Sequence, residues 1–216
     1  MKVLLINGSS NKKGCTNRAL EEVAKTLNEE GIETEIFQIG SKPINDCIGC
    51  MQCAIKLKNN TCVFTDDVVN EVIAKAKECD GFVFGTAVYY AHPSGRVLSL
   101  LDRVFYAGSR VFKHKPAFAV ASARRAGTTA SLDVLNKYFT IAQMPIASSS
   151  YWTMVHGAVG AADQVEQDLE GLQTMRNGAR NLAWLMKCIE AGKKNGIEIP
   201  KNESGTRTNF IRYKVK

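Results

Sequence analysis

The sequence lacks the features that would place the protein in a membrane or outside the cell. No apolar run reaches the roughly 20 residues that cross a bilayer. Met1-Lys2 leads directly into strand-like sequence, without the apolar core of a secretory signal. Without an export signal, the seven cysteines are expected to be thiols or metal ligands and not a disulfide framework. We therefore expect a cytoplasmic protein with no membrane association.

Acidic residues are outnumbered, since 28 Lys and Arg against 21 Asp and Glu give a net charge of +7. A positive chain favours anionic ligands such as phosphorylated cofactors. Nucleic acid is the alternative, but outside the tail Lys193–Lys216 the basic residues are dispersed, which argues against it. The 216 residues show no internal repeat or linker, so we expect one domain over residues 1–192 and a basic arm over residues 193–216.

Both common nucleotide-binding motifs are missing from the loop that follows the first apolar run, Lys2–Asn7. A mononucleotide P-loop needs Gly-x-x-x-x-Gly-Lys-Ser/Thr, but five residues separate Gly8 from Gly14, and Cys15 stands where the lysine belongs. A dinucleotide loop needs a second glycine where Ser10 stands. The loop is instead rich in Ser, Thr and Asn and leads into a helix, an arrangement that suits the binding of a terminal phosphate monoester. An ordinary polar strand-to-helix turn is the alternative.

Apolar residues recur with alternating strand and helix periods along the chain. We expect strands at residues 2–7, 32–39, 81–86, 117–123 and 145–149, and helices at about 16–30, 66–78, 95–107 and 163–190. A further helix follows the strand at 117–123, with Leu132, Leu135 and Phe139 facing inward. The last helix is either continuous or divided near Gly178. Strands separated by helices pair in parallel through right-handed crossovers. The sequence therefore predicts an α/β fold, a three-layer doubly wound parallel sheet with five strands.

Ligands of such sheets bind at the carboxyl ends of the strands, and two further loops there carry suitable residues. The loop Thr86–Gly95 combines aromatic and small residues with a proline, which suits the edge of a flat heterocycle. The loop Ser122–Thr129 offers cationic and amide donors to a carbonyl-rich ring edge. Core aromatics in the first loop and solvated arginines in the second are the alternatives.

A second group of candidate ligands lies in the irregular stretch of about residues 40–65, an insertion that contains Cys47, Cys50, Cys53 and Cys62. Three closely spaced thiols and a more distant fourth can hold a [4Fe–4S] cluster. In ferredoxins the last gap is shorter and a proline follows the last cysteine, whereas here eight residues precede Cys62 and Val63 follows it. A zinc site with four thiolates and plain reduced thiols therefore stay open.

Taken together, these segments resemble the flavodoxin-like NAD(P)H-dependent FMN reductases, and among them the iron–sulfur flavoproteins. The resemblance rests on Gly8–Asn17, Cys47–Asp67, Gly85–Arg103 and Ser150–Gly157. It implies a flavodoxin-like sheet with strand order 2-1-3-4-5 and FMN as the cofactor. It implies that the FMN phosphate is surrounded by Ser9, Asn11, Cys15, Thr16 and Asn17. The ribityl chain and isoalloxazine would border Ala87, Val88, Tyr89, Tyr90, Ser94 and Gly95. The pyrimidine edge of the ring would border Ser122, Arg124 and Gly127.

The resemblance implies an FMN-dependent oxidoreductase that takes a hydride from NAD(P)H and passes electrons to a quinone, a flavin or a protein. A cluster held by the cysteine insertion would lie beside the loop of the first strand. It would pass on the two electrons of the hydride one at a time. Because relatives complete the flavin pocket with a neighbouring subunit, we expect a homodimer or homotetramer. The alternatives are a flavodoxin-type electron carrier without NAD(P)H activity and a cofactor-poor regulatory or nucleic-acid-binding protein.

Overall fold

The computed structural model describes residues 1–206 and 208. The end of the predicted basic arm, residue 207 and residues 209–216, therefore lies outside the described residues. Within the described part, every helix is too short or too polar to span a bilayer.

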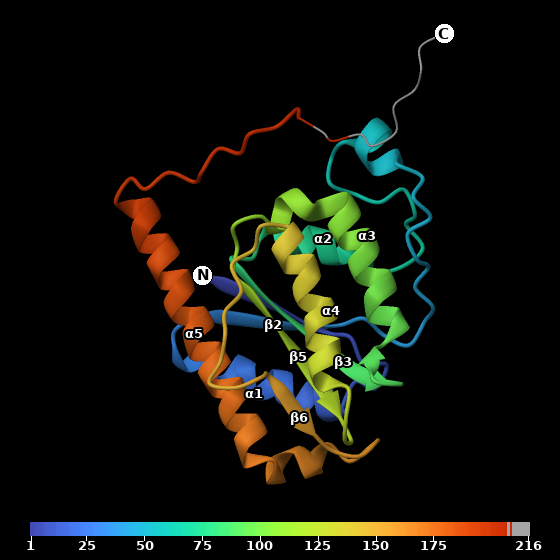
Figure 1. The fold of residues 1–216 in the computed structure, drawn as a ribbon, viewed down its shortest axis with the longest axis vertical. Helices are drawn as coiled ribbons and strands as arrows, with labels where there is room; N and C mark the ends of the chain where they lie inside the picture. Colours follow the sequence, from blue (N-terminus) through green and yellow to red (C-terminus); the bar gives the residue numbers. More distant parts are fainter. Residues whose placement is uncertain (207, 209–216) are drawn as a thin grey trace.

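A parallel sheet forms the centre of the molecule (Figure 1). Its strands are β1 (Lys2–Asn7), β2 (Glu33–Gln38), β3 (Gly81–Tyr89), β5 (Ala117–Ala123) and β6 (Met154–His156). They pair in the order β2-β1-β3-β5-β6, and every pair along this path is parallel. The short strand β4 (His92–Pro93) pairs antiparallel with β3, off this path. The predicted flavodoxin-like order 2-1-3-4-5 is therefore confirmed.

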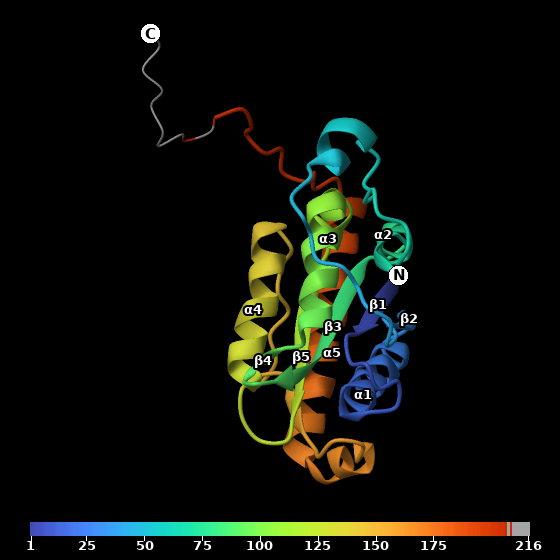
Figure 2. The same cartoon turned by 90° about the vertical axis from the view of Figure 1, so that its right-hand side faces the viewer.

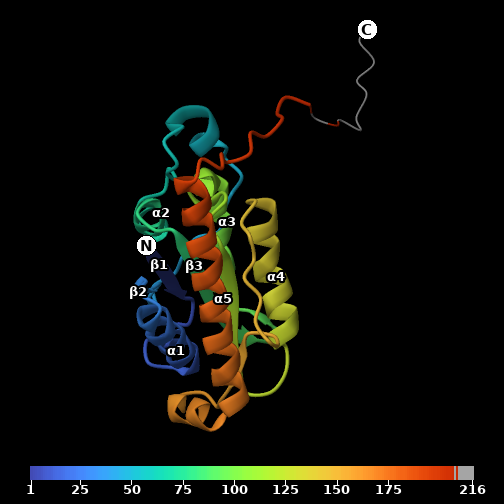
Figure 3. The same ribbon diagram turned by 90° about the vertical axis from the view of Figure 1, so that its left-hand side faces the viewer.

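Helices cover both faces of the sheet, which makes three layers (Figure 2 and Figure 3). They are α1 (Cys15–Glu29), α2 (Val69–Lys77), α3 (Gly95–Phe112), α4 (Thr128–Ile141) and α5 (Leu169–Lys194). Val3 and Leu5 of β1 pack on the side of α1 and α5, and Leu4 and Ile6 on the side of α2, α3 and α4. All four side chains are fully buried, as expected of a central strand covered on both faces.

The outermost strand departs from its predicted position. Near residues 145–149, a single parallel bridge joins Ile146 to Ala117, after which the chain leaves the sheet and returns as β6. The Thr153 hydroxyl donates to the Ala119 carbonyl at the edge that this detour leaves open. The Thr153 carbonyl then accepts from the Ala121 N–H at 3.1 Å, where regular pairing resumes. The edge strand is therefore divided in two.

Several predicted helices also differ in their bounds, two of them for reasons that the structure shows. The helix predicted over residues 66–78 begins at Val69, because the Asp67 side chain precedes it and accepts from the Val69 N–H at 3.1 Å. The final helix begins at Leu169 and not at residue 163, because the chain first forms a short 3-10 helix, η2 (Ala162–Gln167), and it then runs to Lys194 without a break at Gly178. Gly178 instead lets α5 lie close to the sheet, since an added Cβ would be 3.4 Å from the Phe118 ring.

An aromatic cluster fills the core between the sheet and α3 and α4. Phe84 of β3 is fully buried at its centre. The nearest ring is Phe139, with a centroid distance of 5.2 Å, and the rings of Phe82, Phe105 and Phe112 lie at 6.0–6.4 Å. Tilted ring pairs at these distances add to the stabilisation from burial.

Replacement of Phe84 by alanine should lower the free energy of unfolding by about 3–5 kcal/mol, because it removes a buried ring and leaves a cavity. Urea unfolding followed by circular dichroism measures the change. Ile141→Ala, at a side chain that is 82% exposed on α4, is the matched control and should change it little. Equal losses in the two variants would contradict this packing.

Candidate functional site

The loop after β1 is shaped by hydrogen bonds from its own side chains. Asn7 Oδ1 accepts from the Ser9 N–H, Ser9 Oγ from the Asn11 N–H, and Asn11 Oδ1 from the Lys13 N–H, each at 3.1 Å. The Gln38 amide donates to the Ser9 carbonyl at 2.7 Å. Ser9 and Asn11 therefore set the loop's path, and the Ser9 hydroxyl hydrogen remains available to a ligand.

The N-terminus of α1 is open at this loop. Gly14 at its N-cap has no side chain to accept from the first-turn amides, and no acidic residue lies in that turn. α4 also starts without a side-chain cap, at Gly127. In contrast, α3 is capped by Ser94, whose Oγ accepts from the Val97 N–H at 3.3 Å. Free amides at the positive end of a long helix fit the phosphate of FMN.

The loop after β3 is a tight hairpin. Tyr89 pairs with His92, so Tyr90 and Ala91 form a two-residue turn with φ angles of 48° and 59°. This left-handed backbone costs energy in residues other than glycine or asparagine. The turn is held by contact with Gly127, where an added Cβ would lie only 2.3 Å from the Ala91 Cα. The β3–β4 hairpin and the loop before α4 are therefore packed together.

Two further contacts connect these loops to the loop after β1. The Thr16 and Ser122 hydroxyls are buried and lie 2.7 Å apart, joining α1 to the end of β5. The Ser94 hydroxyl lies 3.3 Å from the Gly8 carbonyl, joining α3 to the end of β1. The structure thus brings the three predicted loops to one edge of the sheet, where most of their predicted site residues lie.

The predicted site residues differ in their exposure to solvent, and therefore in whether a ligand can reach their side chains. Ser9, Thr16, Ser94 and Ser122 are buried and hold the loops, while Asn11, Tyr89, Tyr90, Gly95 and Arg124 are exposed, and Asn17, Ala87, Val88 and Gly127 are partly exposed. Cys15 is directed elsewhere, because its thiol contacts the carbonyls of Ala158 and Ala161 at 3.4 and 3.6 Å. Burial raises the pKa of the Cys15 thiol.

Sequence reasoning missed two polar residues that support the site. Asn7 is fully buried, orients Ser9 and donates to Asn17 at 3.2 Å. Gln38, at the end of β2, holds the loop at Ser9 while its Oε1 is buried without a hydrogen-bond partner in the described part of the chain. A polar side chain at the last position of a buried strand is the signal that could have indicated Asn7; Gln38 ends β2, which is only partly buried.

The cysteine insertion runs along α3. Arg96 near the start of α3 donates to the Lys42 carbonyl, and the short helical turn η1 (Cys53–Leu57) lies near the other end of α3 (Figure 1). Cys47, Cys50, Cys53 and Cys62 line one apolar cavity together with Arg103, Tyr106 and Ala107 of α3. The expected position beside the loop of β1 is therefore wrong, because the insertion extends past that loop to the distal part of α3.

The donor set suits an iron–sulfur cluster, since it consists of four cysteines that border one cavity. Within residues 1–206 and 208, however, no three Cys, His, Asp or Glu side chains are already close enough to hold a metal ion. Burial raises the pKa of the Cys53 thiol. Burial would lower the pKa of Arg103, but its hydrogen bonds to Cys62 and Asp67 more than offset this, so that pKa is raised.

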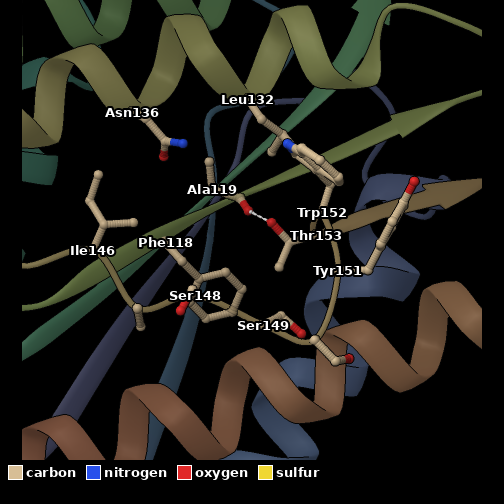
Figure 4. A pocket seen from close by; sticks show the side chains of 12 residues that line it. Phe118, Ala119, Leu132, Asn136, Ile146, Ser148, Ser149, Tyr151, Trp152 and Thr153 are labelled. Carbon is tan, nitrogen blue, oxygen red and sulfur yellow. Dashed lines mark hydrogen bonds between the residues drawn. The ribbon is translucent and has the colours of Figure 1, made fainter.

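A separate cavity of about 340 Å³ lies where the edge strand is divided (Figure 4). Phe118, Leu132 and Ile146 contribute apolar walls, and Asn136 and Trp152 lie at the same cavity. It is lined by Phe118 and Ala119 at the start of β5 and not by the loops at the carboxyl ends of β1 and β3. It is therefore distinct from the predicted flavin site.

Comparison with known proteins identifies the family. The family model described as NADPH-dependent FMN reductase matches residues 1–159. The chain belongs to this family. An iron-sulfur flavoprotein of Methanocaldococcus jannaschii is 32% identical over 199 residues, which are 88% of this chain and 100% of that protein. A second iron-sulfur flavoprotein of the same archaeon is 31% identical over 82% of this chain and 92% of that protein. The predicted family is confirmed, and the protein is an FMN-dependent oxidoreductase.

Solved structures confirm the fold at low sequence identity. RosB with a bound riboflavin-5′-phosphate derivative superimposes with a TM-score of 0.66 and 13% identity, over 100% of this chain and 95% of that one. A flavodoxin from the domain Archaea gives a TM-score of 0.57 and 11% identity, over 87% of this chain and 99% of that one. Both support the flavodoxin-like architecture.

Gly127→Ala should weaken FMN binding about tenfold, which corresponds to about 1.4 kcal/mol. The added methyl would push the β3–β4 hairpin away from the loop before α4. Gly31→Ala is the matched control, because Gly31 also has a positive φ, +78°, but has nothing within 4 Å of an added Cβ. Titration of FMN fluorescence measures both affinities. Equal affinity in the two variants would exclude a role of this contact in cofactor binding.

Proposed function

We propose that the protein binds FMN across the loops of β1, β3 and β5 and uses it to take a hydride from NAD(P)H. The electrons then pass to a quinone, a flavin or a protein acceptor. The observation that carries this proposal is the joining of these loops at one sheet edge, through the Thr16–Ser122 hydrogen bond and the Ala91–Gly127 contact, beside the uncapped N-terminus of α1.

In this proposal the phosphate group lies at the start of α1. The amides of Cys15, Thr16 and Asn17, with the side chains of Ser9 and Asn11, surround it. Cys15 takes part through its backbone, because its side chain faces Ala158 and Ala161. Its thiol thus contacts the loop that contains Ala158 and Ala161 and not the cofactor.

The ring system borders the β3–β4 hairpin and the loop before α4, which are packed together. When bound, FMN supplies the chemistry, accepting a hydride at N5. Ala87, Val88, Tyr89, Tyr90, Ser94 and Gly95 border the ribityl chain and the ring. Arg124, together with the amides at the start of α4, faces the pyrimidine edge, where positive charge favours an anionic reduced ring. Ser122 and Gly127 hold this loop in place.

The surroundings of this edge suit a negatively charged nicotinamide nucleotide. Lys12, Lys13, Arg124 and Arg125 are all exposed on the two loops that flank it. A cationic rim raises the local concentration of anionic substrates and speeds their association. The overall charge of +7 acts in the same direction.

We further propose that Cys47, Cys50, Cys53 and Cys62 hold a [4Fe–4S] cluster. Support comes from the four thiols that line one cavity and from the names of the relatives, which are iron-sulfur flavoproteins. Zinc requires the same tetrahedral set of thiolates, so metal analysis of anaerobically purified protein decides between the two. All seven cysteines are free, which suits the reducing cytoplasm that we propose as its location.

Anaerobic stopped-flow mixing of the FMN-loaded protein with NADPH, and separately with NADH, tests the proposed activity. At least one nucleotide should bleach the visible absorption of the flavin. Arg124→Gln should slow this step about tenfold, about 1.4 kcal/mol, whereas Arg180→Gln, an exposed arginine on α5, should not. An FMN-loaded protein that neither nucleotide bleaches would instead be a flavodoxin-type electron carrier.

We also propose that the protein is a homodimer or homotetramer. Tyr151 and Trp152 are about half exposed beside the divided edge strand, with their rings edge to face at 4.9 Å. Exposed aromatics that are held in place are typical of interfaces. Light scattering at micromolar concentration should give two or four times the mass of one chain. Trp152→Ser should lower this mass, and Trp184→Ser, an exposed tryptophan on α5, should not. A wild-type protein with the mass of one chain would contradict the proposal.

A further inference from the structure

Cys62 is held in place by two helices. On α2, the Asn70 side chain accepts from the Cys62 N–H at 2.7 Å and donates to the Cys62 carbonyl at 2.9 Å. On α3, Arg103 Nε donates to the Cys62 Sγ at 3.4 Å. The backbone and the thiol of this one cysteine are therefore both fixed before any metal is bound.

Arg103 also joins the two ends of the cysteine insertion. Its guanidinium donates to the carbonyls of Asn45 and Phe64, each at 3.2 Å, so it contacts the chain before the first cysteine and after the last. It pairs with the Asp67 carboxylate, which in turn accepts from the Val69 N–H at the start of α2. The side chain is 1% exposed, which makes Arg103 one of the largest fully buried residues described.

The other three thiols are held more loosely. Cys50 is exposed, and among the described residues the Cys53 thiol makes a single long contact, of 3.9 Å, with the Tyr106 carbonyl. η1 begins at Cys53 and contributes no buried residue to the core. A segment with few buried contacts moves at low energetic cost. Cys47, Cys50 and Cys53 can therefore move toward a metal centre that is bound to Cys62.

We propose that Arg103 and Asn70 are positioning residues of the four-cysteine site, which fix Cys62 as the anchor on which the other three thiols close. The Arg103 N–H···S bond also places positive charge at this ligand sulfur. Hydrogen bonds to the sulfurs of an iron–sulfur centre are among the factors that set its reduction potential. This inference rests on the metal site of the proposed function and assigns these residues their part in it.

Substitutions of Arg103 and Asn70 should affect the cluster in different ways. Arg103→Lys keeps a cation beside Asp67 but loses the planar set of donors that reaches Cys62 and two carbonyls together. A reconstituted cluster should then have a more negative reduction potential, as measured by electron paramagnetic resonance during redox titration. Asn70→Ala removes the backbone contacts without a change of charge. It should speed loss of the cluster and leave the potential near that of the wild type.

Arg110→Lys is the matched control, since Arg110 is an exposed arginine on the same helix, seven residues after Arg103. It should change neither the potential nor the retention of the cluster. FMN affinity and the unfolding midpoint, measured on every variant, show whether α3 remains folded. A loss of the cluster together with a loss of FMN affinity in Arg103→Lys would mean a general structural role and would overturn the proposal.

A second measurement separates this inference from the proposed cluster. Titration of the metal-free protein with Co²⁺, followed by its thiolate absorption bands, reports whether the four thiols converge. Arg103→Lys and Asn70→Ala should each weaken Co²⁺ binding about tenfold, because each variant loses hydrogen bonds that hold Cys62 in place. If the wild type takes up Co²⁺ but no iron cluster, the proposed cluster fails and this difference still supports the positioning role. Variants that match the wild type in Co²⁺ affinity and in potential would overturn it.

Discussion

The close approach of Gly8 to β3 and α3 constrains the whole carboxyl edge of the sheet. The Gly8 N–H donates to the Gly85 carbonyl at 2.9 Å, and an added Cβ would lie 2.5 Å from the same oxygen and 2.8 Å from a Val97 methyl. Only a glycine lets the chain leave β1 at this point. Because the loop leaves there, α1 can begin with uncapped amides, and Ser94 can reach the Gly8 carbonyl. The geometry of the candidate phosphate site follows from this one contact.

The periodic parts of the chain could be predicted because burial on both faces of a sheet leaves a clear pattern. β1 and β5 consist almost entirely of buried residues, and α3 and α5 show apolar spacing over several turns. The parts that could not be predicted depend on contacts between distant segments. The β3–β4 turn has no glycine or asparagine to indicate it, and it is held by Gly127. The divided edge strand, likewise, is completed by a side chain, Thr153.

In the candidate site, too, some features could be predicted from the sequence and others could not. The resemblance to a known family named Ser9, Thr16, Ser94 and Ser122 as site residues, and the structure buries all four at or beside the three loops. The sequence did not show that these hydroxyls mainly join the loops to one another. Nor did it show that the Cys15 thiol faces the carbonyls of Ala158 and Ala161, since helical position alone does not decide which neighbour a side chain meets.

The position of the cysteine insertion changes how the two proposed cofactors relate. Arg96 lies near the flavin end of α3 and Arg103 at the cysteine cavity. Seven residues of helix between them correspond to about 10 Å along the axis. α3 therefore connects the two sites, capped by Ser94 at one end and bonded through Arg103 to Cys62 further along. Two helices and one buried arginine thus make the insertion part of the domain rather than an appendage.

The central claim is that the loops of β1, β3 and β5 form one FMN site with the phosphate at the start of α1. A crystal structure of the protein with FMN tests this most directly. In that structure the phosphate should accept hydrogen bonds from the amides of Cys15, Thr16 and Asn17, and the ring should border both the β3–β4 hairpin and the loop before α4. A phosphate bound away from the start of α1, or a ring in the cavity beside β5, would contradict it.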